Sequence, residues 1–149
     1  MHGLPGNFYV FYALTPPGRE AAFYEDFQTI LRREGIKPNP GINDTEGVRR
    51  HVVESTNFHF SIWAVNTVRD PRSAQELGKP CKGQEKDVRF WPREFGVTVA
   101  TMRPFGSDAR SKALSDRLKR AVGEAGYQVQ DERFPCGGEV LEEGELKTQ

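Results

Sequence analysis

The residues best suited to chemistry lie in one short stretch, Asn57–Ile62, which reads Asn-Phe-His-Phe-Ser-Ile. Apolar residues alternate there with polar ones, and this alternation predicts a β-strand whose successive side chains point to opposite faces. We expect the strand to run from Ser55 to about Val68, with His59 and Ser61 on one face. An imidazole titrates near neutral pH and a hydroxyl donates a hydrogen bond, so the pair suits general acid–base chemistry or the binding of a polar ligand.

Three more side chains are candidates for ligand binding. Trp63 falls on the same predicted face as His59 and could form the floor of a nucleobase pocket. Tyr12 belongs to an aromatic stretch, and Arg103 follows a later strand, where its guanidinium could meet a phosphate. The structural alternatives stay open: His59 as an ordinary strand residue, core packing for the two aromatic rings, and a solvated surface position for the arginine.

Composition and charge narrow the function classes. The chain has 149 residues, the size of one domain, and we expect 1–149 to be a single domain. Lys and Arg number 21, as do Asp and Glu, so the chain lacks the basic excess typical of non-specific nucleic-acid binders. Cys81 and Cys136 form no metal-binding motif, and we expect neither a metal site nor a cofactor.

The sequence also bears on location. No run of 18 or more apolar residues and no apolar leader is visible, which predicts a cytoplasmic protein with free thiols and no membrane contact. Glu139 and the acidic residues after it predict a frayed tail over 139–149.

Periodicity and turn residues predict the elements that must position the candidate residues. We expect strands over 8–14, 55–68, 95–102 and from 127, and helices over 19–34 and 107–125, with Ser107 as the N-cap of the second. This duplicated order favours an α+β, ferredoxin-like βαββαβ sandwich, an antiparallel sheet with two helices on one face. The pattern over 48–54 fits a strand or a helical turn, and the polar connection 69–94 is long enough to be functional, for example as a lid.

Residues Asn57–Ile62 resemble the first motif of the two-histidine phosphoesterases, the superfamily of the 2′,5′ RNA ligase-like proteins. That motif reads Asn-apolar-His-apolar-Thr-apolar, and the preceding aromatic strand, proline turn and amphipathic helix fit as well. The resemblance implies two ferredoxin-like lobes and a cleft in which two His-x-Thr/Ser motifs act on a phosphodiester. It assigns proton transfer to His59, phosphate contact to Ser61, and ligand binding to Asn57.

The second motif of that family is missing. No histidine follows position 59, and the stretch Gly96-Val97-Thr98-Val99 carries the motif's flanks with glycine in the histidine place. Thr98 is therefore a ligand-binding candidate without a histidine partner. The resemblance implies a degenerate phosphoesterase-like protein that binds, and at most slowly hydrolyses, a nucleotide, a cyclic nucleotide or an RNA-end phosphodiester.

Two other function classes remain open, so the sequence does not decide whether the protein is an enzyme. One is a ferredoxin-like interaction module that binds a protein partner or a second copy of itself. The other is a small-molecule enzyme of the dimeric ferredoxin-like type, with His59 as a base in a pocket walled by Trp63 and the tyrosines. The surroundings of His59 distinguish the three classes.

Overall fold

The computed structural model describes residues 4–45, 48–69, 92–134 and 139–140. Within these residues the chain forms an α+β fold with one six-stranded antiparallel sheet, a separate two-stranded pairing and two helices. The strands are β1 (Leu4–Thr15), β2 (Asn39–Thr45), β3 (Val48–Thr56), β4 (Phe60–Asn66), β5 (Val68–Arg69), β6 (Arg93–Arg103), β7 (Gln128–Gln130) and β8 (Glu139–Val140). The helices are α1 (Glu20–Arg33) and α3 (Asp108–Glu124).

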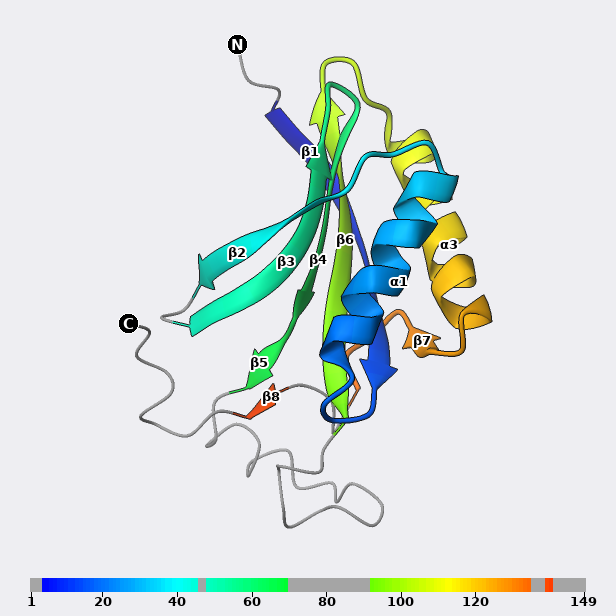
Figure 1. The fold of residues 1–149 in the computed structure, drawn as a ribbon. Coiled ribbons are helices and arrows are strands. Elements are labelled where there is room, and N and C mark those ends of the chain that lie inside the picture. The colour runs from blue at the N-terminus through cyan, green and yellow to red at the C-terminus, as the bar shows by residue number, and fades with distance from the viewer. Residues whose placement is uncertain (1–3, 46–47, 70–91, 135–138, 141–149) are drawn as a thin grey trace.

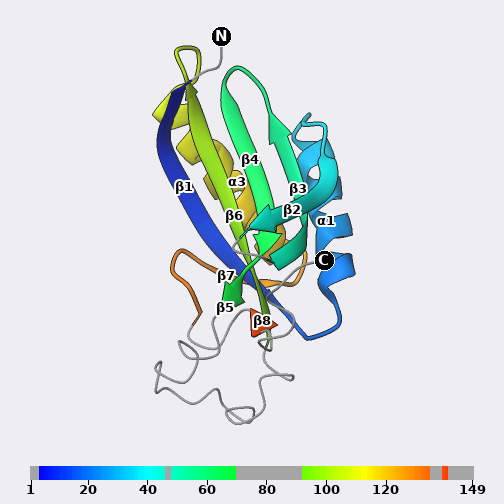
Figure 2. The ribbon, with the colours of Figure 1, turned by 90° about the vertical axis from the view of Figure 1, so that its left-hand side faces the viewer.

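The strands of the large sheet lie in the order β2-β3-β4-β6-β1-β7, and every neighbouring pair is antiparallel. β1 thus lies between two other strands, as its apolar residues on both faces predict. Figure 1 shows α1 and α3 side by side on one face of the sheet, as the sequence predicts. Figure 2 shows the opposite face, which neither helix covers and which we call the open face.

Both helices form where their periodicity predicts them. Their apolar stripes are buried: Phe23, Phe27, Ile30 and Leu31 in α1, and Leu114, Leu118 and Val122 in α3. After α1, Gly35 has a φ of 76°, and the N–H of Ile36 donates to the carbonyl of Leu31 at 2.9 Å, so a glycine cap ends the helix. Ser107 caps α3, because its hydroxyl accepts from the backbone N–H of Arg110 at 3.2 Å.

The core between the helices and the sheet is built around aromatic rings. Phe23 of α1 stacks on Phe95 of β6 with 4.0 Å between ring centroids, and Tyr127 meets Phe23 edge-on. The Tyr127 hydroxyl donates to Asp26 at 2.6 Å. Burial and the neighbouring carboxylate both raise the pKa of Tyr127. These contacts hold α1 against β6 and tie it to the segment that follows α3.

The chain between α1 and β4 differs from the expectation. Residues 39–56 form the hairpin β2–β3 at the edge of the sheet, which therefore has six strands rather than the four of a βαββαβ unit. The prediction of one continuous strand from Ser55 is wrong: Ser55 and Thr56 end β3, and β4 begins only at Phe60. Residues 57–59 are the turn between them.

A buried carboxylate ties the segment after β7 to the sheet. Glu94 is fully buried and accepts hydrogen bonds from Arg133 Nε at 2.8 Å, the Thr67 hydroxyl at 2.8 Å and the backbone N–H of Phe134 at 2.7 Å. A buried charge is tolerated when it is paired and hydrogen-bonded in this way. The anchored segment leads toward β8, which pairs in parallel with β5.

Several expectations concern residues outside the described ranges. The connection 70–91, both cysteines and residues 141–149 lie there. The tail that we expected to fray from Glu139 begins with the short strand β8.

Candidate functional site

Asn57 builds the turn that carries His59. Its side-chain oxygen accepts from the backbone N–H groups of His59 at 2.8 Å and Phe60 at 2.9 Å, and its own N–H donates to the carbonyl of Phe60. Asparagine favours such turns because its side chain can replace a backbone acceptor. The side-chain oxygen of Asn57, the residue to which the resemblance assigns ligand binding, is thus engaged within the turn, and His59 lies outside any strand.

The turn is fixed from the other side by the loop between β6 and α3. The carbonyl of His59 accepts from the N–H of Met102 at 3.0 Å, and its ring Nδ1 lies 3.3 Å from the carbonyl of Phe105. A Cβ at Gly106 would collide with the carbonyl of His59 and would lie 2.5 Å from that of Met102. Only glycine fits there, so the two loops interlock and give His59 a defined place.

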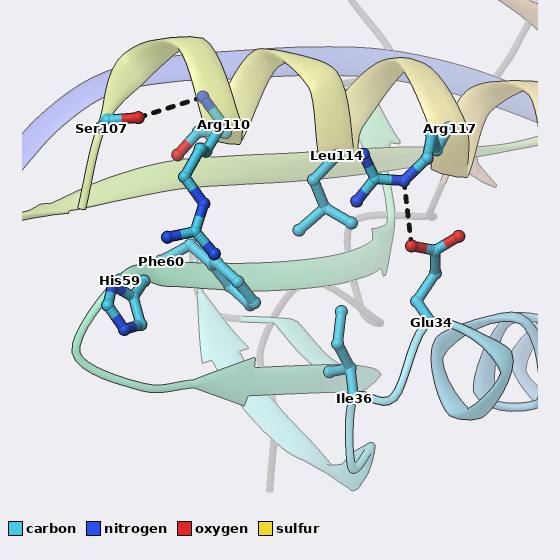
Figure 3. Close-up of a pocket in the computed structure, with 9 residues that line it drawn as sticks. Glu34, Ile36, His59, Phe60, Ser107, Arg110, Leu114 and Arg117 are labelled. Atoms are coloured by element: carbon cyan, nitrogen blue, oxygen red, sulfur yellow. Dashed lines mark hydrogen bonds and ion pairs between the residues drawn. The ribbon is translucent and has the colours of Figure 1, made fainter.

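His59 lines a pocket of about 170 Å³ on the helix side of the sheet (Figure 3). The other lining residues come from the end of α1, the start of β4 and one face of α3: Glu34, Ile36, Phe60, Ser107, Arg110, Ser111, Leu114 and Arg117. Figure 3 shows Phe60, Leu114 and Ile36 as the apolar floor between the helices and β4. The rim is polar, so the pocket combines an apolar floor with charged groups at its mouth.

The charges at the rim differ between its two ends. At one end the Nε of Arg117 donates to Glu34 at 3.0 Å, and the two charges compensate each other. At the other end Arg110 points over the floor toward Phe60 and His59 (Figure 3), and its guanidinium has no acid partner within the described ranges. Two arginines against one glutamate leave the lining with one net positive charge, located beside His59.

Ser61 does not belong to this pocket. It is the second residue of β4, and its hydroxyl lies 2.8 Å from that of Thr56 on β3. The prediction that His59 and Ser61 share one strand face is wrong, because the Asn57 turn ends the alternation before β4 begins. A single phosphate therefore does not meet both side chains in the manner that the family motif implies.

The remaining aromatic and threonine candidates gather on the open face. Trp63 lies opposite Thr98 in the pairing of β4 with β6, and its ring meets Phe8 of β1 edge-on at 6.3 Å. Tyr12 follows on β1, with its ring beside Gly96. Trp63, Thr98 and Tyr12 thus lie on the same side of the sheet as one another, and none lines the pocket that holds His59.

Arg103 is engaged in an ion pair near the start of α3. Its Nη2 lies 2.9 Å from Asp108, which also accepts from the Asn7 side-chain amide at 2.8 Å. Hydrogen bonding from the Thr101 hydroxyl, the Asn7 backbone N–H and Arg103 holds the pKa of the Asp108 carboxyl below its ordinary value of 3.8. Arg103 therefore serves the joint between β1, β6 and α3, and it does not line the pocket.

Arg110 and Arg117 are the pocket residues that sequence reasoning missed. A signal for them exists, because positions 110, 114 and 117 are three and four apart and fall on one side of a helix. Leu114 belongs to the buried apolar stripe of α3, and the two arginines flank that stripe. Their approach to His59 depends on the tertiary structure and has no local signature.

No family model, no curated protein and no solved structure matches the chain. Among the described residues, no three His, Cys, Asp or Glu side chains gather as a metal site would require. No helix in the described part of the chain is both long and apolar enough to cross a bilayer. The function is therefore inferred from the residues and geometry of the site itself.

Proposed function

We propose that this protein binds a phosphate-bearing ligand in the pocket between the His59 turn and α3. The observation that carries the proposal is Arg110, a cation with no acid partner in the described ranges, placed beside His59 over an apolar floor. A guanidinium matches the geometry of phosphate oxygens and often binds them through two hydrogen bonds. The apolar floor keeps water from one side of the contact, which strengthens such bonds.

The neighbours of Arg110 suit the same ligand. The Ser107 hydroxyl accepts from the N–H of Arg110 and keeps its own hydrogen for a phosphate oxygen. The pocket adjoins the first turn of α3, where backbone N–H groups favour an anion. These groups add to the attraction of Arg110 and His59 for one anionic group.

The chemistry at the site favours binding over turnover. Metal-free cleavage of a phosphodiester needs both a base and an acid near neutral pH. Among the residues that line the pocket, His59 is the single imidazole. We therefore expect hydrolysis to be slow or absent, which fits the degenerate relative of two-histidine phosphoesterases that the first motif implies.

The strand order supports a ferredoxin-like assignment as part of the same proposal. β7, β1, β6 and β4 are consecutive in the sheet, with α1 between β1 and the β2–β4 strands and α3 between β6 and β7. In this interpretation the hairpin β2–β3 is an addition at one edge of a βαββαβ unit.

A thermal-shift screen tests the proposal. The probes are inorganic phosphate, mononucleotides, cyclic nucleotides and 2′,3′-cyclic phosphates. A ligand at 100 times its Kd stabilises the folded state by about 2.7 kcal/mol, which raises Tm by several degrees. We expect Arg110→Ala to abolish the shift, and Arg120→Ala, an exposed arginine of α3 outside the pocket, to keep it. A shift that survives Arg110→Ala, or no shift with any probe, contradicts the proposal.

A second candidate function is a protein-interaction module that pairs with a second copy through the open face. The observation that favours it is Phe8, which is 56% exposed at its contact with Trp63 on a face that neither helix covers. Sedimentation velocity over a concentration series tests it: a dimer that Phe8→Asp dissociates supports this function. A chain that is monomeric at all concentrations rejects it.

A further inference from the structure

The pocket is too small for a whole nucleotide. Pockets that enclose a drug-sized ligand measure about 300–1,000 Å³, whereas this one measures about 170 Å³. A phosphate group fits such a volume, and the rest of a phosphorylated ligand must then lie outside the mouth. The residues at the mouth next to His59 therefore decide which kind of ligand the site prefers.

Two exposed aromatic residues adjoin His59, although neither is among the residues that line the pocket. Phe58 is 73% exposed and Phe105 is 66% exposed, and their rings meet edge-on with 5.9 Å between centroids. Phe58 precedes His59 in the turn, and the carbonyl of Phe105 lies 3.3 Å from the His59 ring. Single exposed apolar residues are ordinary on protein surfaces, but two large rings in contact form a patch that suits a binding partner.

The two loops that carry the rings are held in place by hydrogen bonds and close backbone packing. The Asn57 side chain closes the turn behind Phe58, and the tight contact of Gly106 with His59 anchors the loop that carries Phe105. Neither ring belongs to the core. The fold thus presents two exposed aromatic rings on well-defined loops, and the core does not use them.

We propose that Phe58 and Phe105 form a stacking platform for a nucleobase whose phosphate occupies the His59–Arg110 pocket, so that the ligand class is nucleotides rather than simple phosphates. This inference rests on the proposed phosphate site. The apolar platform beside a cationic pocket matches the two chemical halves of a nucleotide, a planar base and an anion. Stacking on aromatic side chains is tolerant of base identity, because every base has a π-face.

Isothermal titration calorimetry with adenosine 5′-monophosphate and ribose 5-phosphate tests the inference, because these probes share the phosphate and the sugar and differ in the base. We expect the nucleotide to bind the wild type about tenfold more tightly, as stacking on aromatic side chains predicts. The double variant Phe58→Ala/Phe105→Ala should lose this advantage and keep its affinity for ribose 5-phosphate. Phe58→Trp should retain the advantage, and Ile42→Ala, which removes a side chain 59% exposed elsewhere, should leave both affinities unchanged.

The outcomes separate the two proposals. If the wild type binds both probes equally well and Arg110→Ala weakens both, the stacking platform is contradicted. The phosphate site is then still supported. A nucleotide advantage that persists in the double variant also overturns the platform, since the base then binds elsewhere. Failure of both probes to bind the wild type overturns the phosphate site itself. Because both phenylalanine side chains are exposed, circular dichroism should show the double variant folded as the wild type.

Discussion

At the scale of single residues, one asparagine decides where the candidate histidine lies. By accepting two backbone N–H groups, Asn57 ends β3, begins β4, and directs His59 to the helix side of the sheet. Ser61, only two residues later, contacts Thr56 instead. The chemistry that sequence reasoning assigned to one pair is thus divided between two regions of the molecule.

Two alanine variants test this division. We expect His59→Ala to weaken binding of a phosphorylated ligand about ten- to a hundredfold, because a hydrogen bond to a charged group contributes about 1.5–3 kcal/mol. Ser61→Ala is the matched control, and its Kd should stay within about twofold of the wild type. Equal losses in both variants, measured by titration calorimetry, would show that the two side chains share a ligand after all.

The carboxylate of Asp108 makes the free energy of unfolding depend on pH. Its folded-state pKa is held below the ordinary value by hydrogen bonds, chiefly from Thr101, so its carboxylate stabilises the fold above that value. This contribution is lost as the pH falls through the lowered pKa. We therefore expect Asp108→Asn to reduce the free energy of unfolding at pH 7, and the difference from the wild type to narrow below about pH 4. Urea titrations across this range check the sign, and a difference that grows on acidification contradicts it.

At the scale of elements, the site depends on two loops that interlock, the β3–β4 turn and the β6–α3 loop. Neither loop shows regular periodicity, and both meet at Gly106. The two helices, in contrast, were predictable from local signals: the period of their apolar residues, the Ser107 cap and the glycine after α1. Their stripes are buried as expected because helix packing preserves that period.

Gly106→Ala tests the interlock. Its Cβ would collide with the carbonyl of His59, so the loops must separate, and we expect a loss of about 1–3 kcal/mol in stability together with loss of phosphate binding. Gly41→Ala is the control, because a Cβ there meets no atom within 4 Å. Denaturation and titration of both variants measure the two effects. A Gly106→Ala protein that behaves like the control would refute the close approach.

The hydrogen bonds of buried Glu94 also connect elements, because they tie the segment after β7 to the sheet. Within the described residues, Arg133→Ala leaves the buried Glu94 side chain with the Thr67 hydroxyl and the Phe134 N–H as partners, and we expect it to cost about 1–3 kcal/mol. Thermal unfolding should show a clear fall in Tm, while the exposed Arg120→Ala changes stability by less than about 0.5 kcal/mol. Equal melting temperatures would mean that Arg133 adds nothing to the anchor.

At the scale of the whole molecule, local periodicity predicts the strands and helices of the α+β class, and their duplicated order predicts both helices on one face of the sheet. In the edge hairpin, the pattern over 48–54 left a strand and a helical turn open, and β3 forms there; β2 escaped prediction because Pro38, Pro40 and Gly41 resemble a loop. The alternation of apolar and polar residues also predicts a strand through Phe58, but this residue lies in a turn and its side chain is 73% exposed. The pocket could not be predicted, because Arg110 meets His59 only when α3 packs across the start of β4.

The fold presents two candidate surfaces on opposite sides of one sheet. The helix side carries the pocket of His59 and Arg110, and the open face carries Tyr12, Trp63 and Thr98. The family resemblance assigns roles to both His59 and Ser61, which lie in different regions of the molecule, whereas the charge and the pocket favour the helix side. Where a phosphorylated ligand binds on this molecule is therefore the central question.

Chemical-shift mapping by ¹H–¹⁵N NMR, with a mononucleotide titrated into the labelled protein, answers that question most directly. The account predicts that shifts concentrate in the β3–β4 turn around His59, in the loop at Phe105, and in the first turns of α3 around Arg110. The open-face amides of Trp63 and Tyr12 should stay in place. Shifts centred on Ser61, Trp63 and Thr98, with the amides of α3 unchanged, would contradict the account and place the ligand on the other side of the sheet.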